Sequence, residues 1–205
     1  MVHYRASDIV KESCMKIVYC TKNNIQKEVT EWMLRGVNYQ HSVVEEHIKQ
    51  GGKVYEEMAG TCAVADAYVD FSIDMIHDGT FIEIKSVSDP NDYAQWYLNQ
   101  SILQCVLYKT LLLNMADKVL QTASFRIDES HPKEVINVDV TQPYRLIFGD
   151  VGVFEVDVTN PAKVFDFFTK KVKALDGYDS AKEFDLIYKH KEFDTLKGCF
   201  TYTKI

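Results

Sequence analysis

Residues 72–86 carry two acids and a lysine on either side of a tight-turn dipeptide, Asp78-Gly79. An Asp-Gly pair between two β-prone runs favours a two-residue hairpin, because such turns need backbone conformations that these residues tolerate. The hairpin brings Asp74 on one strand close to Glu83 and Lys85 on the next. Since alternate residues of a strand share a face, Glu83 and Lys85 project together. The sequence therefore predicts that two carboxylates and an ammonium group converge at one point.

Paired carboxylates of this kind suit a hard divalent cation, Mg²⁺ or Mn²⁺, which prefers oxygen ligands. Such a cation polarises a phosphate oxygen and lowers the pKa of bound water, and Lys85 can orient that water or stabilise charge on phosphorus. The same pattern also occurs in surface hairpins with a cross-strand ion pair worth under about 1 kcal/mol. Asp70 is an alternative metal ligand on the same strand, but Asp74 is preferred because it lies nearer the turn and faces Glu83.

Two helical pairs flank the hairpin in sequence. His41 and Glu45 are four residues apart and share a face of a predicted helix, where a neutral imidazole facing the acids would complete a metal shell. Gln104 and Tyr108 have the same spacing on a later helix, where an amide and a phenol can contact a phosphate or hold the catalytic strand. Each pair taken alone is more typical of packing or of solvent exposure, so their meaning depends on their order along the chain.

In that order, residues 36–113 resemble the PD-(D/E)xK nuclease superfamily, and within it the RecB-like branch that includes the CRISPR-associated adaptation nucleases. The resemblance implies a restriction-endonuclease-like α/β core that hydrolyses phosphodiester bonds with Mg²⁺ or Mn²⁺, with DNA favoured over RNA as substrate. The roles it implies are metal binding for His41, Asp74, Glu83 and the backbone carbonyl of Ile84, catalysis for Lys85, and support for Glu45, Gln104 and Tyr108.

The chain departs from the family pattern in two respects. Ile73 precedes Asp74, so a literal Pro-Asp pair is absent. The five cysteines (Cys14, Cys20, Cys62, Cys105 and Cys199) form no CxxC pair, which argues against the iron–sulfur subgroup and favours free thiols in a reducing, intracellular compartment.

Three alternatives to this hypothesis remain at the level of sequence. A viral cap-snatching RNA endonuclease has a similar order of histidine, two acids and lysine, although Gln104 and Tyr108 would then have no role. A non-catalytic nucleic-acid-binding or assembly module on the same scaffold is the second. The third is an unrelated interaction protein in which the matching residues are coincidental.

Composition sets limits on the partners. The 205 residues are 46% hydrophobic and 26% charged, which predicts one folded domain over 1–205. The formal net charge is −7, which lowers the expectation of tight unaided binding to nucleic acid, because phosphate contacts rely on Lys and Arg. We therefore expect a protein partner that delivers the substrate. No apolar run has the length of a membrane span, and no signal-peptide pattern is found, so no membrane partner is expected.

The elements that must position these residues follow from hydrophobic periodicity and from turn residues. Helices are predicted over 23–35, ended by Gly36, and over 39–50, 94–115, 160–175 and 180–190. Strands are predicted over 53–58, within 65–76, and over 80–87, 118–127, 135–140 and 153–158. This order favours an α/β fold with a central mixed sheet flanked by helices. Its core is expected over about 23–158, with a helical extension over about 160–205.

Two groups of residues are possible contacts for nucleic acid. Basic residues follow Pro161 and can track a phosphate backbone, although a solvated amphipathic face is the more ordinary interpretation. They are Lys163, Lys170, Lys171, Lys173, Lys189, Lys191 and Lys197. Tyr93, Trp96 and Tyr97 follow the catalytic strand, where they can stack on bases or pack in the core.

Overall fold

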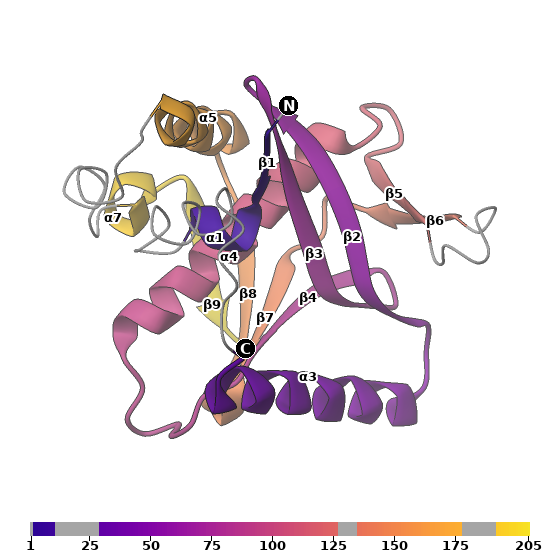
Figure 1. The fold of residues 1–205 in the computed structure, drawn as a ribbon. Helices are drawn as coiled ribbons and strands as arrows, with labels where there is room; N and C mark the ends of the chain where they lie inside the picture. The colour runs from indigo at the N-terminus through magenta and orange to yellow at the C-terminus, as the bar shows by residue number, and fades with distance from the viewer. Residues whose placement is uncertain (1, 11–28, 127–134, 178–191) are drawn as a thin grey trace.

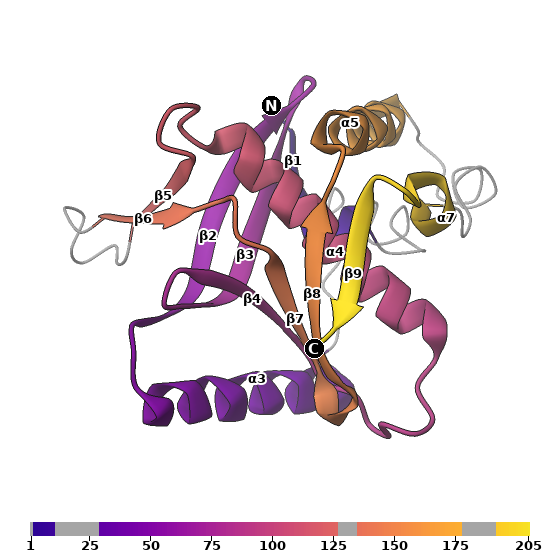
Figure 2. The same ribbon diagram turned by 180° about the vertical axis from the view of Figure 1, so that it is seen from behind.

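A mixed sheet of seven strands forms the centre of the molecule, with helices on both of its faces (Figures 1 and 2). The computed structural model describes residues 2–10, 29–126, 135–177 and 192–205. The predicted α/β class, with a central mixed sheet flanked by helices, is confirmed.

The order of strands across the sheet is β1-β3-β4-β7-β8-β9, and β2 pairs with β3 outside this path. Pairs β1–β3 and β4–β7 are parallel, and the other pairs are antiparallel. The bounds are β1 Val2–Arg5, β2 Val54–Val64, β3 Ala67–His77, β4 Thr80–Lys85, β7 Tyr144–Phe148, β8 Gly152–Val158 and β9 Phe200–Lys204. Strands β5 (Thr122–Arg126) and β6 (Val135–Asp139) form a separate antiparallel pair.

Strand β3 has two successive partners along one edge. It pairs with β1 up to the Arg5–Asp70 position and with β4 from the Met75–Ile82 position onward. Residues 71–74 lie between these two pairings, while β2 follows the other edge of β3 almost throughout. The neighbours of β3 therefore change at this point, and Asp74 lies in the interval that they leave.

Helices α3 (Glu31–Gln50) and α4 (Gln95–Met115) cover opposite faces of the sheet (Figures 1 and 2). Val44 of α3 packs against Met75, Ile82 and Ile84 in a small apolar cluster. Helix α4 lies in the main core against β7, β8 and α5 (Pro161–Gly177), with the short helices α1 (Ala6–Ile9) and α7 (Glu192–Leu196) nearby. Within the described ranges, no helix combines the length and the apolar character that a membrane crossing requires.

Helix α3 is one continuous helix where the sequence predicts two. Thr30 caps its start, accepting a hydrogen bond from the Met33 amide at 3.3 Å, and Gly51 with a φ of 87° ends it. Gly36 lies in its interior, so the predicted stop there is wrong. An internal glycine weakens a helix by only about 1 kcal/mol, and no proline follows to end it. Residues 23–28 of the predicted first helix lie outside the described residues.

The sheet extends beyond the predicted core at both ends. Strand β1 pairs with β3, and strand β9 pairs with β8, so residues before 23 and after 158 contribute strands. The limits 23–158 are therefore too narrow, and the region 160–205 is more than a helical extension. The predicted helix over 180–190 lies outside the described residues.

Strand β7 is a central strand that the sequence analysis missed. It lies between β4 and β8, and its Tyr144, Leu146 and Phe148 are fully buried. The buried positions alternate with half-buried Arg145 and Ile147, which is the pattern of a strand with one core-facing side. The segment is short and lies between Pro143 and Gly149, so it offers little periodicity to detect.

Three cysteines are described, Cys62, Cys105 and Cys199, and all three are buried free thiols. Burial raises the pKa of the Cys105 thiol well above its ordinary value. These cysteines therefore behave as small apolar core residues. Cys14 and Cys20 lie outside the described residues.

Candidate active site

The site is built on the hairpin of β3 and β4. Asp78 and Gly79 form its turn with φ values of 47° and 80°, as the sequence predicts. The β3–β4 pairing ends at Met75 and Ile82, and Asp74 and Glu83 are the next residues along the two strands. Their carboxyl groups lie close enough that each affects the pKa of the other.

Glu83 is the most buried member of the site, with its side chain 1% exposed. One carboxylate oxygen, Oε1, accepts a hydrogen bond from the Gln104 amide at 2.6 Å and another from the Lys85 ammonium. The other oxygen, Oε2, is buried and accepts no hydrogen bond from a donor group of the described residues, and the Asp74 carboxyl lies within hydrogen-bonding reach of Glu83. A buried carboxylate oxygen without a partner is costly, so it marks a place where a ligand would be favourable.

Asp74 reaches from β3 to β4 through its side chain. Its Oδ2 accepts a hydrogen bond from the backbone amide of Ile84 at 2.8 Å. This contact fixes the carboxylate beside Glu83 at the point where β3 changes partners. The backbone of Ile84, whose carbonyl is a predicted metal ligand, therefore lies at the site as well.

Helix α4 supplies the residues that hold Glu83 in place. Gln104 donates to Glu83 and also lies 3.0 Å from the Tyr108 hydroxyl. The Tyr108 ring packs in the core against Phe71 and Tyr144, with centroid separations of 5.6 and 6.3 Å. The i, i+4 spacing of Gln104 and Tyr108 thus lets the Gln104 amide bridge the Glu83 carboxylate and the Tyr108 hydroxyl.

The electrostatics of the cluster reflect its burial. Burial raises the pKa of Glu83 to about 8, against the opposing effect of the Lys85 charge and with the charge of Asp74 adding to the rise. Burial also raises the pKa of Asp74. For Lys85, burial acts to lower the pKa, but the charges of Glu83 and Asp74 outweigh it and hold the pKa above its ordinary value. The two acids are thus close, desolvated and short of positive charge.

A cavity of about 410 Å³ opens onto these groups. Its lining is mostly polar side chains from α1, β3, β4 and α4: Ser7, Ser72, Asp74, Glu83, Lys85, Tyr97, Gln100, Ser101, Gln104 and Tyr108. The Lys85 side chain is 22% exposed, so its ammonium group can reach a molecule in the cavity while paired with Glu83.

The donor set fits a small hard cation. Mg²⁺ commonly binds through one or two carboxylates and keeps several waters, so Asp74 and Glu83 are sufficient protein ligands. The unpartnered Oε2 of Glu83 is the free ligand atom that such a cation requires. Over the described ranges, no group of three or more His, Cys, Asp or Glu side chains is arranged to hold a metal, so a wholly protein-built cage is absent from them.

His41 and Glu45 are not brought together with these acids. Both are exposed on α3, and Glu45 pairs with Lys49 at 3.9 Å. Helix α3 packs through Val44 on the face of β4 that carries Ile82 and Ile84, whereas Glu83 points to the opposite face. The predicted metal role of His41 and the supporting role of Glu45 therefore lack the geometry they need in this structure.

Asp70, the alternative metal acid, is also separate from the cluster. Its two carboxylate oxygens bond to His3 at 2.8 Å and to Thr61 at 2.7 Å. Between them, these partners from β1 and β2 occupy both oxygens of Asp70. The structure therefore favours Asp74 over Asp70, as the sequence analysis does.

The predicted basic track along α5 is interrupted. Lys171 is fully buried and bonds to the Ile9 carbonyl and to Glu192, the latter at 2.7 Å, so it cannot contact a phosphate backbone. Lys170 is exposed but pairs with Asp166 at 2.6 Å. Lys163, Lys173 and Lys197 are exposed, and Lys189 and Lys191 lie outside the described residues.

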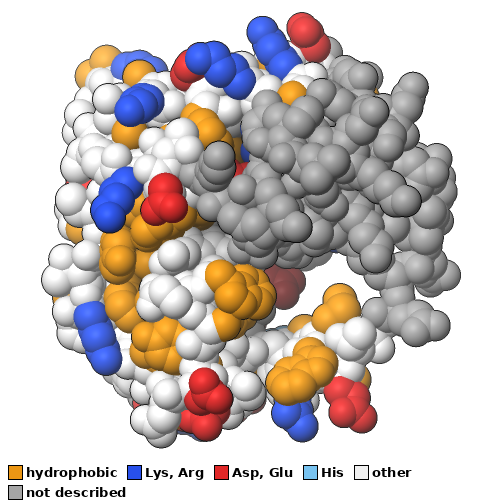
Figure 3. Space-filling view, turned by 90° about the vertical axis from the view of Figure 1, so that its left-hand side faces the viewer, with side chains coloured by type: hydrophobic (Ala, Val, Ile, Leu, Met, Phe, Trp, Pro, Cys, Tyr) orange, Lys and Arg blue, Asp and Glu red, His pale blue; other side chains and the backbone are white. Residues whose placement is uncertain are grey.

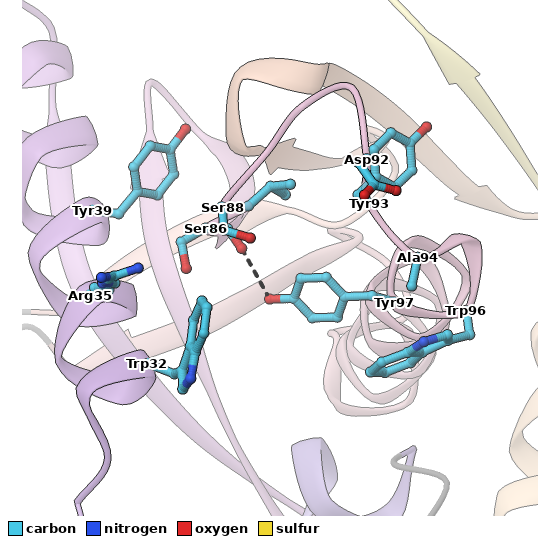
Figure 4. A pocket seen from close by; sticks show the side chains of 11 residues that line it. Trp32, Arg35, Tyr39, Ser86, Ser88, Asp92, Tyr93, Ala94, Trp96 and Tyr97 are labelled. Carbon is cyan, nitrogen blue, oxygen red and sulfur yellow. Dashed lines mark hydrogen bonds between the residues drawn. The ribbon is translucent and has the colours of Figure 1, made fainter.

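A second, larger hollow of about 710 Å³ adjoins the site, and we call it the aromatic pocket (Figure 4). Its lining residues are Trp32, Arg35, Tyr39, Ser86, Val87, Ser88, Asp92, Tyr93, Ala94, Trp96 and Tyr97. Tyr97 lines both cavities, and its hydroxyl donates to the Ser86 carbonyl at 3.4 Å. Sequence reasoning found the α4 side of this pocket but missed Trp32, Arg35 and Tyr39, because helical spacing does not show which side chains of a helix stay exposed.

Comparisons with known proteins inform the fold. No family model matches the sequence, and no curated protein sequence matches it. A solved structure described as the crystal structure of SSO0001 is similar, with a TM-score of 0.54 and 12% sequence identity. The similarity covers 88% of this chain and 80% of that chain. At this level of identity it establishes a shared fold and carries no statement about activity.

Proposed function

We propose that the chain is a metal-dependent nuclease of the PD-(D/E)xK type that hydrolyses phosphodiester bonds with Mg²⁺ or Mn²⁺. The observation that carries the proposal is the state of Glu83. One of its oxygens is held by Gln104 and Lys85, while the other is buried without a partner beside Asp74 and a cavity.

Asp74 and Glu83 are the residues that would hold the cation, with the Ile84 carbonyl as the predicted backbone ligand. When bound, a divalent cation polarises a phosphate oxygen and lowers the pKa of a water molecule. The protein favours its binding electrostatically, because two carboxylates buried side by side repel one another and gain from a shared positive charge.

Lys85 is the group that would contact the reacting atoms. Its ammonium is held protonated by Glu83 and Asp74 and remains partly exposed to the cavity. A protonated amine at this position donates hydrogen bonds to a phosphate oxygen or to the attacking water, and it stabilises negative charge that develops on the phosphate. It does not act as a base, because it carries its proton at neutral pH.

Gln104 and Tyr108 act as positioning residues. The Gln104 side-chain amide donates to Oε1 of Glu83 and to the Tyr108 hydroxyl, and it leaves Oε2 of Glu83 without a hydrogen-bond donor. This contact supports the RecB-like form of the proposal over a cap-snatching endonuclease, in which these two residues would have no role. DNA remains the expected substrate ahead of RNA, following the resemblance.

The test is cleavage of labelled single- and double-stranded DNA and RNA with Mg²⁺, with Mn²⁺ and with EDTA. We expect cation-dependent cleavage that Lys85→Ala reduces by about a hundredfold or more, as for loss of an electrostatic stabiliser of the transition state. Lys53→Ala is the matched control, because Lys53 is an exposed lysine near the hairpin turn and remote from the cavity lining. Absence of cleavage of every substrate, or equal activity in both variants, would contradict the proposal.

A further inference from the structure

We propose that the aromatic pocket holds an unpaired base of a single-stranded substrate whose phosphate lies at Asp74, Glu83 and Lys85. This inference rests on the proposed nuclease function, and it assigns that function a substrate class and a second set of contacts.

The aromatic pocket adjoins the carboxylate cavity. The pocket lies between the first turns of α3 and α4 and the segment that follows β4 (Figure 4). On the same side of the molecule, the surface is hollowed and bordered by hydrophobic side chains (Figure 3). Because Tyr97 lines both the pocket and the carboxylate cavity, a chain whose phosphate is in one reaches directly into the other.

The two tryptophans of the aromatic pocket are exposed. Trp32 is 67% exposed and Trp96 is 54% exposed, although large aromatic side chains are normally buried in a core. They come from different helices, and Trp96 lies beside Tyr97 with 5.8 Å between ring centroids. Exposed aromatic rings around a hollow are the usual platform on which proteins stack bases of single strands.

The aromatic pocket also contains polar and charged groups. The guanidinium of Arg35 lies 5.1 Å from the centre of the Trp32 ring, a stacked arrangement that recurs in base recognition. Ser86 and Ser88 add hydroxyl groups, and Asp92 is the one acid in the lining. A planar, polar-edged ring satisfies this combination better than an aliphatic side chain does, because only the former uses both the stacking faces and the hydrogen-bonding groups.

The lining of the aromatic pocket also bears on whether the substrate is base-paired. A base in this pocket has left its stack and its partner, since rings from α3 and α4 would occupy the space of both. Stacking also suits a chain with a net charge of −7, in which attraction to phosphates is a weak source of affinity. The substrate is therefore single-stranded at the position that is cut.

Intrinsic fluorescence gives a direct test, because the chain has two tryptophans and both line the pocket. We would titrate the Glu83→Gln variant, which binds without cutting, with an oligothymidylate and with a blunt duplex. We expect the Kd obtained from fluorescence quenching to be at least about tenfold lower for the single strand than for the duplex. Equal response to both forms, or no response to either, would overturn the inference.

Kinetics of the active protein give a second test. We expect Trp32→Ala and Trp96→Ala each to raise KM for a single strand by about tenfold, within the range measured for lost base stacking, and to change kcat less than about twofold. Trp32→Phe, which keeps a ring, should restore most of the affinity. Tyr202→Ala is the control, because Tyr202 is an exposed aromatic residue of β9 outside the pocket. Tryptophan variants that match this control would overturn the inference.

An abasic position scanned along the single strand completes the test. At one position near the cut, the abasic site should raise KM by about the same factor as Trp32→Ala does. Combining the abasic substrate with the Trp32→Ala variant should raise KM little more than either change alone. The two proposals fail separately. Cleavage that needs Lys85 but ignores the tryptophans and the abasic scan overturns the base pocket alone. Single-strand quenching without cleavage by the unaltered protein under any cation overturns the nuclease proposal alone.

Discussion

Among the described residues there are two buried lysine–glutamate pairs, Lys85–Glu83 at the hairpin and Lys171–Glu192 between α5 and α7. In both, the glutamate is almost fully buried and the ammonium contacts it directly. Lys171 also donates to the Ile9 carbonyl, so this pair joins α5 and α7 to the end of α1.

The pairs differ in what they leave unsatisfied. Glu83 keeps a buried oxygen without a partner and has the carboxylate of Asp74 beside it, whereas no oxygen of Glu192 is buried and unpartnered within the described residues. The 410 Å³ polar cavity also opens at Glu83. Burial of an ion pair is therefore not evidence of a site by itself. A buried carboxylate oxygen without a partner, on a residue that lines the polar cavity, is what separates the hairpin pair from the structural one.

The largest expected difference between the two pairs is in activity. Glu83→Gln removes a charge needed for the cation, so cleavage should fall by about a thousandfold or more, which corresponds to several kcal/mol. The free energy of unfolding should stay equal or rise, because a buried carboxylate whose pKa is raised to about 8 is itself unfavourable in the fold at neutral pH. Cleavage assays and urea unfolding in EDTA measure the two effects. If Glu83→Gln failed to fold, the distinction between a functional pair at Glu83 and a structural pair at Glu192 would be wrong.

The opposite pattern is expected at the second pair. Lys171→Met leaves Glu192 buried without its partner, which should lower the free energy of unfolding by about 3–5 kcal/mol. Cleavage per folded molecule should be unchanged, since neither Lys171 nor Glu192 lines the cavity. Chemical denaturation, together with activity at a temperature where the variant remains folded, checks both statements. A large loss of kcat without loss of stability would contradict the comparison.

A smaller effect is expected from Tyr108→Phe. The ring keeps its packing on Phe71 and Tyr144 while the hydroxyl beside the Gln104 amide is lost. We expect Mn²⁺ affinity and cleavage to fall by about tenfold, the lower end of the effects of groups that orient metal ligands. Calorimetric titration with Mn²⁺ separates this from a packing defect, which would lower stability and leave metal affinity unchanged.

A further difference is expected in the pH dependence of stability without metal. Since the pKa of Glu83 is raised to about 8 in the fold, its contribution to stability is present below the unfolded pKa of about 4.3 and is lost as pH rises toward 8. In EDTA, the unfolding free energy of the unaltered protein should therefore fall over this window more steeply than that of Glu83→Gln. If the unfolding free energies of the two proteins changed in parallel with pH, the pKa of Glu83 would not be raised in the folded protein.

The hairpin could be predicted from sequence because its determinants are local. Asp78-Gly79 fixes the turn, the turn fixes the register through Met75 and Ile82, and Asp74 and Glu83 are the next residues along the two strands. The i, i+4 spacing of Gln104 and Tyr108 is equally local, so their common face was predictable. What required the structure was the identity of the partner, namely that this face of α4 meets Glu83.

The wrong expectations concern long-range packing. Helical spacing puts His41 and Glu45 on one face of a helix, but it does not say which face of the sheet that helix covers. Burial of Lys171 depends on Ile9 and Glu192, which lie 162 and 21 residues away in the chain. Strand β7 is specified by its place between β4 and β8 and carries only a short pattern of its own.

Mn²⁺ binding to the metal-free protein tests the central claim most directly. Titration calorimetry should give one site per chain in the unaltered protein and in Lys171→Met, and no binding in Glu83→Gln or Asp74→Asn at the same concentrations. Equal Mn²⁺ affinity in all four proteins would show that the unpartnered oxygen of Glu83 is not a metal ligand, and the account of this site would then be wrong.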